Sequence, residues 1–194
     1  ISGNRCEKGA ALKQNFEHVP NLYLYKYDKI LSYQPSEEKD YTHDVGIPLA
    51  LNMYENIPFW QPFFDALGMR VHYSDRSNKK LYEKGQDSVP SDTICYPAKL
   101  VHGHIESLYE KSLDFIFYPN MPFNFLEKDH GDNHYNCPVV AHYPEVIDAN
   151  MDHIDLNKYI QPYLTFNEKK KFIKAMIETL KPLKKLSKIA VSDT

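Results

Sequence analysis

Three cysteines are the side chains in this sequence with the clearest potential for chemistry. Cys95 lies in a polar run, directly before a stretch of helical spacing, and Cys137 stands at the start of an apolar run. A thiol just ahead of a helix lies at the positive end of the helix dipole, which favours the thiolate and therefore metal binding. Cys6 lies far from both along the chain, and three separated cysteines make a poor disulfide framework. We therefore expect free thiols, or ligands of a metal or a cluster.

An iron–sulfur cluster is the first possibility for these thiols. Such a cluster normally takes four ligands, most of them thiolates, so Cys95 and Cys137 do not suffice alone. Cys6 would supply a third ligand if the first segment of the chain folds back. The simpler alternative is that each cysteine is a small buried side chain without a ligand role. The polar surroundings of Cys95 argue against burial there, whereas Cys137 borders a predicted strand.

Zinc is the competing metal. His134 and Cys137, together with Cys95 and either His102 or His104, would form a tetrahedral set of nitrogen and sulfur ligands. The spacing does not match a compact zinc finger, and two histidines two residues apart point to different sides of a helix. Such histidines more often form hydrogen bonds at the surface or in the core. Zinc therefore stays an alternative to iron–sulfur.

The elements that would position these residues alternate between strands and helices. Short apolar runs predict buried strands at 45–51, 69–74, 113–119 and 137–141. Helical spacing predicts helices at 58–67, closed by Gly68, and at 78–85, 97–111 and 166–181. This alternation implies an α/β fold with a mainly parallel sheet and right-handed crossovers.

The chain divides into three parts by composition. Residues 1–43 are predicted to be an N-terminal extension and linker. In it, the alternating stretch 21–27 would either add an edge strand or lay an aromatic stripe across the core. Residues 44–150 are predicted to form the α/β domain, and residues 151–194 a C-terminal helical segment that packs on it. The last helix is amphipathic with a lysine-rich outer face. Its apolar side is predicted to be Ile173, Met176, Ile177 and Leu180.

Further candidate residues lie where a parallel sheet places its functional cleft, beyond the carboxyl ends of the strands. Lys99 and His102, on one face of a predicted helix, would suit an anionic ligand, although such residues are more often solvated. The candidates for substrate or ligand binding are Asn52, Tyr54, Glu55, Lys99, His102, Asn120 and His134.

Composition argues against several classes of function. The net charge of −3 argues against nucleic-acid binding, which normally needs a basic surplus. No apolar run approaches the roughly 20 residues that cross a bilayer, and no signal-peptide pattern opens the chain. We therefore expect a cytoplasmic fragment of a larger protein, with no membrane partner. With 7 glycines, the sequence has neither phosphate-loop pattern, and it has no G-x-S-x-G motif.

Several long phrases resemble one known family, in the same order. They are GIPLALNMYEN at 46–56 followed by PFW at 58–60, PSDTICYPAKLVHGHI at 90–105, DNHYNCPVV at 132–140, and the opening SGNRCE at 2–7. This resemblance is to the acyl-CoA dehydratase activase-related domain, and it covers most of residues 1–150. It implies a Rossmann-like, three-layer domain similar to subunits of 2-hydroxyacyl-CoA dehydratases.

The resemblance also implies a place in an enzyme system of anaerobic metabolism. In the family, this domain commonly follows ATPase activase modules in one polypeptide, and ATP hydrolysis drives one electron into a dehydratase that holds a [4Fe–4S] cluster. Cys95, Cys137 and Cys6 become candidate cluster ligands, while the fragment alone is expected to be inactive. Relatives often carry a cysteine where this sequence has Asn120, and asparagine is a poor ligand for iron.

Three functions follow as hypotheses. The first is an iron–sulfur, electron-transfer or dehydratase-like domain. The second is a non-catalytic binding or scaffolding domain, without a cofactor, for the ATPase activase or an acyl-CoA. The third is a structural domain supported by zinc.

Overall fold

The computed structural model describes residues 20–125, 133–155 and 157–183. The described residues divide into two units, with the boundary between Ser32 and Tyr33. The described part of the first unit holds α1 (Leu22–Leu31). The edge strand predicted at 21–27 is therefore wrong. The side chain of Asn21 caps this helix by accepting a hydrogen bond from the Leu24 backbone N–H at 3.0 Å, and such a cap begins a helix rather than a strand.

A parallel sheet of four strands lies at the centre of the second unit. Its order is β2-β1-β3-β5, and every neighbouring pair is parallel. The strands are β1 (His43–Ile47), β2 (Met69–Tyr73), β3 (Phe115–Phe117) and β5 (Tyr159–Ile160). Strands β2 and β3 lie within the strands predicted from apolar runs, whereas β1 begins two residues before the run predicted at 45–51 and ends at Ile47. The parallel sheet is confirmed.

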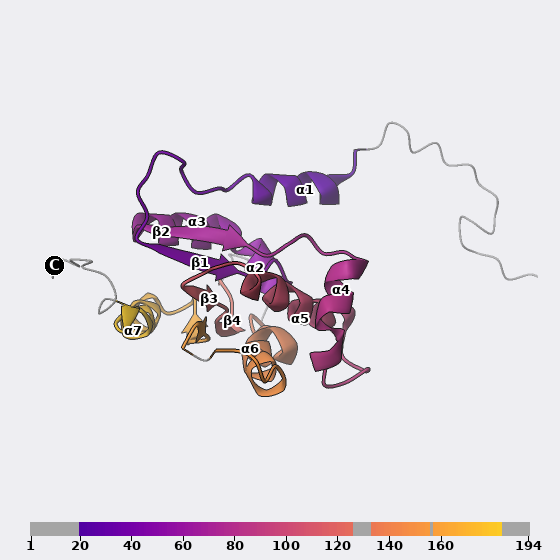
Figure 1. The fold of residues 1–194 in the computed structure, drawn as a ribbon. Coiled ribbons are helices and arrows are strands. Elements are labelled where there is room, and N and C mark those ends of the chain that lie inside the picture. The colour runs from indigo at the N-terminus through magenta and orange to yellow at the C-terminus, as the bar shows by residue number, and fades with distance from the viewer. Residues whose placement is uncertain (1–19, 126–132, 156, 184–194) are drawn as a thin grey trace, which may run out of the picture. The chain divides into compact units, whose positions relative to one another are not determined.

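Helices cover both faces of this sheet, which gives three layers. On one face, Trp60 and Phe64 of α3 (Ile57–Ala66) pack against Phe117, with ring centroids 4.9 and 5.1 Å apart. On the other face lies α5 (Tyr96–Tyr109), where Leu108 faces Gly46 of β1. Figure 1 shows α3 and α5 on opposite sides of the sheet. The predicted Rossmann-like α/β fold is confirmed.

Shorter elements connect these layers. Gly68 ends α3 with a φ of 75°, a conformation that favours glycine. The side chain of Asn78 caps α4 by accepting a hydrogen bond from the Leu81 backbone N–H at 3.0 Å. The connecting helices are α2 (Leu51–Glu55), α4 (Lys79–Gly85) and the 3₁₀ turn η1 (Gln86–Ser88).

The fourth strand predicted at 137–141 is wrong, because these residues begin α6 (Pro138–Asn150). Cys137 is the N-cap, and its sulfur accepts a hydrogen bond from the Val140 backbone N–H at 3.5 Å. Pro138 occupies the first turn, where its missing N–H is not needed. The short apolar run is thus the start of an amphipathic helix, and β5 is the fourth strand of the sheet.

The described part of the stretch 151–194 holds two strands besides its predicted helix. One is β5, and the other is β6 (Tyr163–Thr165), which pairs in parallel with β4 (Asn120–Phe123) in a second, two-stranded sheet. The helix is α7 (Lys169–Leu180). No helix in the described ranges is long and apolar enough to cross a membrane.

The predicted apolar side of α7 is only half correct. Met176 is buried and Leu180 packs partly against the core, but Ile173 and Ile177 are 44% and 56% exposed. Apolar residues occur on more than one side of this helix, so only one of these sides can face the core. Phe172 lies on that side and contacts the aromatic rings around Trp60.

Candidate functional site

The carboxyl ends of the strands meet at one edge of the sheet, where the chain turns from β1 into α2 and from β2 toward α4. Ser74 follows β2 directly, and its hydroxyl accepts a hydrogen bond from the Leu49 backbone N–H at 2.8 Å. Leu51, the first residue of α2, has a φ of 50°, which is uncommon for a residue with a side chain. This edge is therefore a tightly bonded turn region with local backbone strain.

His104 of α5 lies fully buried behind this edge. Its Nδ1 is 2.7 Å from the Ser74 hydroxyl and its Nε2 is 2.9 Å from the Ser77 hydroxyl. Burial lowers the pKa of His104 to about 4, although the nearby Asp75 acts in the opposite direction. The imidazole is consequently neutral near pH 7 and uses both nitrogens to hold the segment after β2.

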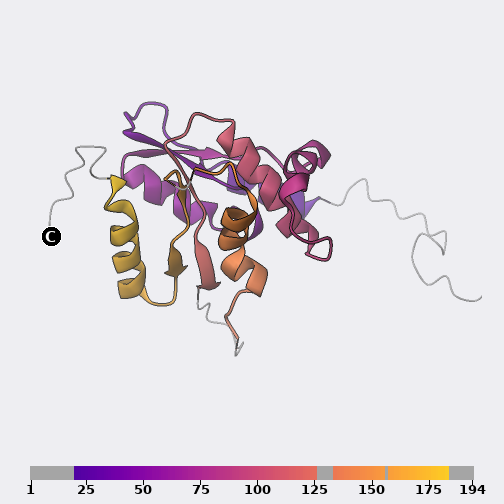
Figure 2. The same cartoon turned by 60° about the horizontal axis from the view of Figure 1, so that its bottom comes forward.

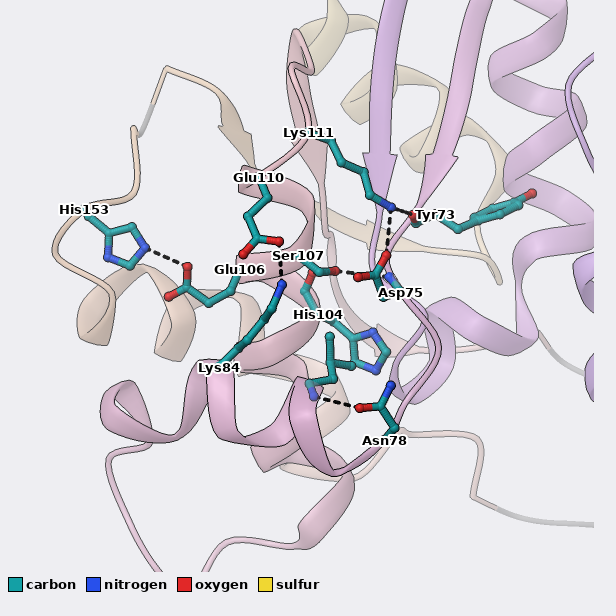
Figure 3. A network of polar contacts seen from close by, with 11 residues as sticks. Tyr73, Asp75, Asn78, Lys84, His104, Glu106, Ser107, Glu110, Lys111 and His153 are labelled. Carbon is teal, nitrogen blue, oxygen red and sulfur yellow. Dashed lines mark hydrogen bonds and ion pairs between the residues drawn. The ribbon is translucent and has the colours of Figure 1, made fainter.

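A polar network continues from His104 along α5 (Figure 3). The Ser107 hydroxyl donates to the His104 carbonyl at 3.0 Å and accepts from the Asp75 backbone N–H at 3.1 Å. The Lys111 ammonium lies 3.3 Å from the Asp75 carboxylate and donates to the Tyr73 carbonyl at 2.6 Å. Together these bonds fix the end of β2 and its following loop to α5.

His102 lies on the other side of α5 and, like His104, is buried and bonded to two hydroxyl groups. Its Nδ1 is 2.7 Å from the Ser88 hydroxyl and its Nε2 is 2.9 Å from the Tyr143 hydroxyl of α6. Burial lowers the pKa of His102 to about 4. Because the two nitrogens of both buried histidines already bond to hydroxyl groups, neither ring is free to bind zinc. No group of three or more His, Cys, Asp or Glu in the described residues could hold a metal ion.

Both described cysteines are exposed and occupy equivalent places. Cys95 is the N-cap of α5 and Cys137 is the N-cap of α6, each followed by a proline in the first turn. Burial and, to a lesser extent, the nearby Cys95 raise the pKa of Tyr143 to about 12. The Cys95 thiol is therefore near enough to Tyr143 of α6 to interact with it. Cys6 lies outside the described residues.

Asn120 lies at the start of β4 and is only 1% exposed. Its amide Nδ2 donates to the Gln161 carbonyl at 3.0 Å, and its backbone N–H donates to the Pro162 carbonyl at 2.8 Å. The amide oxygen is buried and has no hydrogen-bond partner in the described residues. Asn120 thus joins β4 to the link between β5 and β6, which is a structural role for this side chain.

Asn52 has a similar environment at the edge. Its amide Nδ2 lies 3.1 Å from the sulfur of Met121, and its oxygen is buried without a partner in the described residues. The neighbouring Tyr54 is half-buried, whereas Glu55 is exposed at the end of the same helix. These three predicted residues share α2, and the side chain of Asn52 contacts Met121 of β4.

Lys99 and His134 have separate surroundings. The Lys99 ammonium donates to the Asp92 carbonyl at 2.8 Å, within the loop that precedes its own helix. The His134 ring lies 5.9 Å from the Phe123 ring, between centroids, at the end of β4. No contact in the described part of the chain joins Lys99 to His134, so these two candidates do not form one site with each other.

Sequence reasoning missed the hydroxyl partners of the buried histidines. Ser74 and Ser77 lie in a loop, Ser88 ends the 3₁₀ turn, and Tyr143 lies in α6, of which only the first residues fall in the strand predicted at 137–141. The one available signal was the polar run after the second predicted strand, which lies at the carboxyl edge. Nothing local in the sequence pairs these serines with histidines on a helix some 15 to 30 residues later.

Comparison with known proteins gives one match. Residues 44–193 match the family described as the CoA enzyme activase uncharacterised domain (DUF2229). No curated protein and no solved structure matches the chain. The matched region contains every described residue of the sheet edge, including both helix-capping cysteines. The chain therefore belongs to the CoA enzyme activase uncharacterised domain family.

Proposed function

We propose that this domain is a non-catalytic binding module of a CoA enzyme activase system, and that its role is to dock the ATPase module of the activase. The observation that carries the proposal is the state of Asn120. The family resemblance of the sequence implies a cysteine at this position in many relatives, whereas Asn120 is buried and bonded to the Gln161 carbonyl. An amide in that position supports packing of the strands rather than binding of iron.

The described residues do not fit a [4Fe–4S] cluster of the chain's own. A cluster takes four ligands, mostly thiolates, and the described residues offer two cysteines. The nearby histidines are buried and bonded to hydroxyl groups through both ring nitrogens. The electron chemistry that such a cluster would supply therefore has no complete ligand set in this part of the chain.

The remaining features support docking. Buried neutral histidines and their hydroxyl partners fix the loops behind the sheet edge, so the edge is a preorganised surface. Tyr96 stands on that edge next to Cys95, 56% exposed, with its ring 5.5 Å from the ring of Tyr82. Exposed tyrosines with fixed neighbours are frequent anchors of protein interfaces.

A titration of the purified ATPase module into the full chain tests docking. We expect a dissociation constant on the order of 1–10 µM, as for a transient domain interface. Tyr96→Ala is expected to weaken binding roughly tenfold, because it removes an aromatic anchor. Lys158→Ala, on the strand-entry side of the sheet, serves as the control and leaves binding unchanged. Absence of heat with the ATPase module, or saturable heat with an acyl-CoA alone, contradicts the docking proposal.

A cluster completed by ligands from outside the described residues is the second candidate. The observation in its favour is that both described thiols are exposed N-caps of helices that contact each other. Cys6 and cysteines of another module would then supply the remaining ligands. The two candidates differ in whether reconstitution in the presence of the partner module adds iron that is lost in the variant Cys95→Ser/Cys137→Ser.

A further inference from the structure

Helix α7 carries two apolar sides, and only one of them packs against the domain. Met176 is buried, and Phe172 lies 5.5 Å from Phe166 and 5.7 Å from Phe59, between ring centroids. Ile173 and Ile177 point away from this core and are 44% and 56% exposed. They are one helical turn apart, so their side chains form a continuous ridge on the outer side.

A shallow groove of about 480 Å³ runs along the outer side of α7 beside this ridge. The groove is lined by Lys170, Ile173, Lys174, Ile177, Glu178 and Lys181. These residues are separated alternately by three positions and by one position, which is the spacing of a single stripe along an α-helix. The two isoleucines thus form an apolar centre between charged residues, which is the arrangement of a helix surface that binds another helix.

The charge of the groove is positive although the whole chain carries a net charge of −3. Three lysines and one glutamate line it. The neighbouring Lys171 is neutralised by Glu168 at 2.8 Å. In contrast, Lys170, Lys174 and Lys181 form no ion pair with any residue in the described ranges. An occupant with carboxylates beside an apolar ridge would complement both properties of this surface.

We infer that the outer groove of α7, defined by these six residues, binds an acidic amphipathic helix of a partner protein. Apolar side chains of that helix pack against Ile173 and Ile177, and its carboxylates pair with Lys170, Lys174 and Lys181. The inference does not depend on the docking role proposed for the sheet edge. Figures 1 and 2 both show α7 far from α4, which follows that edge in the chain, so the two surfaces are separate.

Two other occupants fit the groove less well. A second copy of the chain would bring the lysines of two α7 helices together, and like charges across an interface are unfavourable. A membrane surface would suit the lysines, but interfacial helices bury a wide apolar face, usually with aromatic side chains. The outer side of α7 offers two isoleucines, and its aromatic residue Phe172 is held in the core.

The test is a fluorescence anisotropy titration of the full chain with a labelled acidic helical peptide, which carries leucine at heptad positions a and d and glutamate at e and g. We expect a dissociation constant on the order of 10 µM at low salt. Ile173→Gln/Ile177→Gln and Lys170→Gln/Lys174→Gln are each expected to weaken binding by roughly fivefold or more. The charge-matched control Lys79→Gln/Lys80→Gln, on α4, is expected to change binding by less than about twofold.

Other results would overturn the inference. If Lys170→Gln/Lys174→Gln and the control Lys79→Gln/Lys80→Gln weakened peptide binding equally, and the isoleucine changes had no effect, the peptide would be attracted only by unspecific charge. Self-association that the isoleucine changes abolish would make a second copy the occupant. Binding to phosphatidylserine vesicles but not to the peptide would indicate a membrane surface. Binding that begins only after truncation at residue 183 would show that the chain's own last residues fill the groove. All three double variants alter exposed residues, so their thermal unfolding should match that of the wild type.

Discussion

Replacing Gly103 with alanine is expected to lower the free energy of unfolding by about 3 kcal/mol. A Cβ at this position would lie 1.9 Å from the backbone oxygen of Leu81, and backbone cannot move away as the end of a side chain can. Helix propensity alone predicts the opposite result, a gain of about 1 kcal/mol, because Gly103 lies in the interior of α5. The sign of the change therefore distinguishes close packing of α4 on α5 from a loose contact.

Gly46→Ala is the matched control for this prediction. A Cβ at Gly46 would meet the Leu113 Cδ1 at 2.7 Å and the Leu108 Cδ2 at 3.2 Å, which are ends of flexible side chains. A loss of about 1 kcal/mol is expected there, since these leucines can adjust. Urea denaturation followed by circular dichroism measures both variants. A Gly103→Ala protein at least as stable as the wild type would show that α4 does not pack on α5 as described.

Acidification from pH 6.5 to pH 4 is expected to destabilise the domain by about 5 kcal/mol through two buried histidines. Burial lowers the pKa of His102 and of His104 from 6.5 to about 4. Between these values the unfolded chain binds more protons than the folded chain, so stability falls as the pH falls. The stabilising contribution is complete above pH 6.5 and is lost as the pH approaches 4, below which both states are protonated.

Urea denaturation at a series of pH values measures this dependence. The variant His102→Gln/His104→Gln is expected to be less stable at pH 7, because it loses hydrogen bonds to hydroxyl groups, but its stability should change less between pH 6.5 and 4. Equal pH dependence in the two proteins would mean that the imidazoles titrate normally. In that case they are not buried as described, and the edge of the sheet is not fixed by them.

The main elements were predictable because their local signals agree with the fold. Apolar runs gave β1, β2 and β3, and Gly68 correctly marked the end of α3. The run after Cys137 was ambiguous, since Pro-Val-Val-Ala suits a strand as well as the first turn of a helix. The helix is favoured by the proline in its first turn and by the cysteine that caps it. Strand β5 has two residues, too few for any periodic signal.

The candidate site was predictable only in part. Cys95 was expected ahead of a helix and is its N-cap, since a polar run followed by helical spacing is a local signal. The bonds of His102 and His104 to Tyr143, Ser74 and Ser77 depend on how α5 packs, which no short stretch of sequence encodes. The exposure of Ile173 and Ile177 likewise depends on which side of α7 the core accepts.

The iron and acid-labile sulfide content of the isolated full chain tests the central claim most directly. After anaerobic reconstitution with iron and sulfide, the wild type is expected to hold less than about 0.5 iron atoms per chain, and no more than Cys95→Ser/Cys137→Ser. A binding module without a cluster gives this result, both alone and when the ATPase module is present during reconstitution and the iron held by that module is subtracted. About four iron and four sulfide per chain in the wild type, with an EPR signal on reduction and loss of both in the double variant, would contradict it.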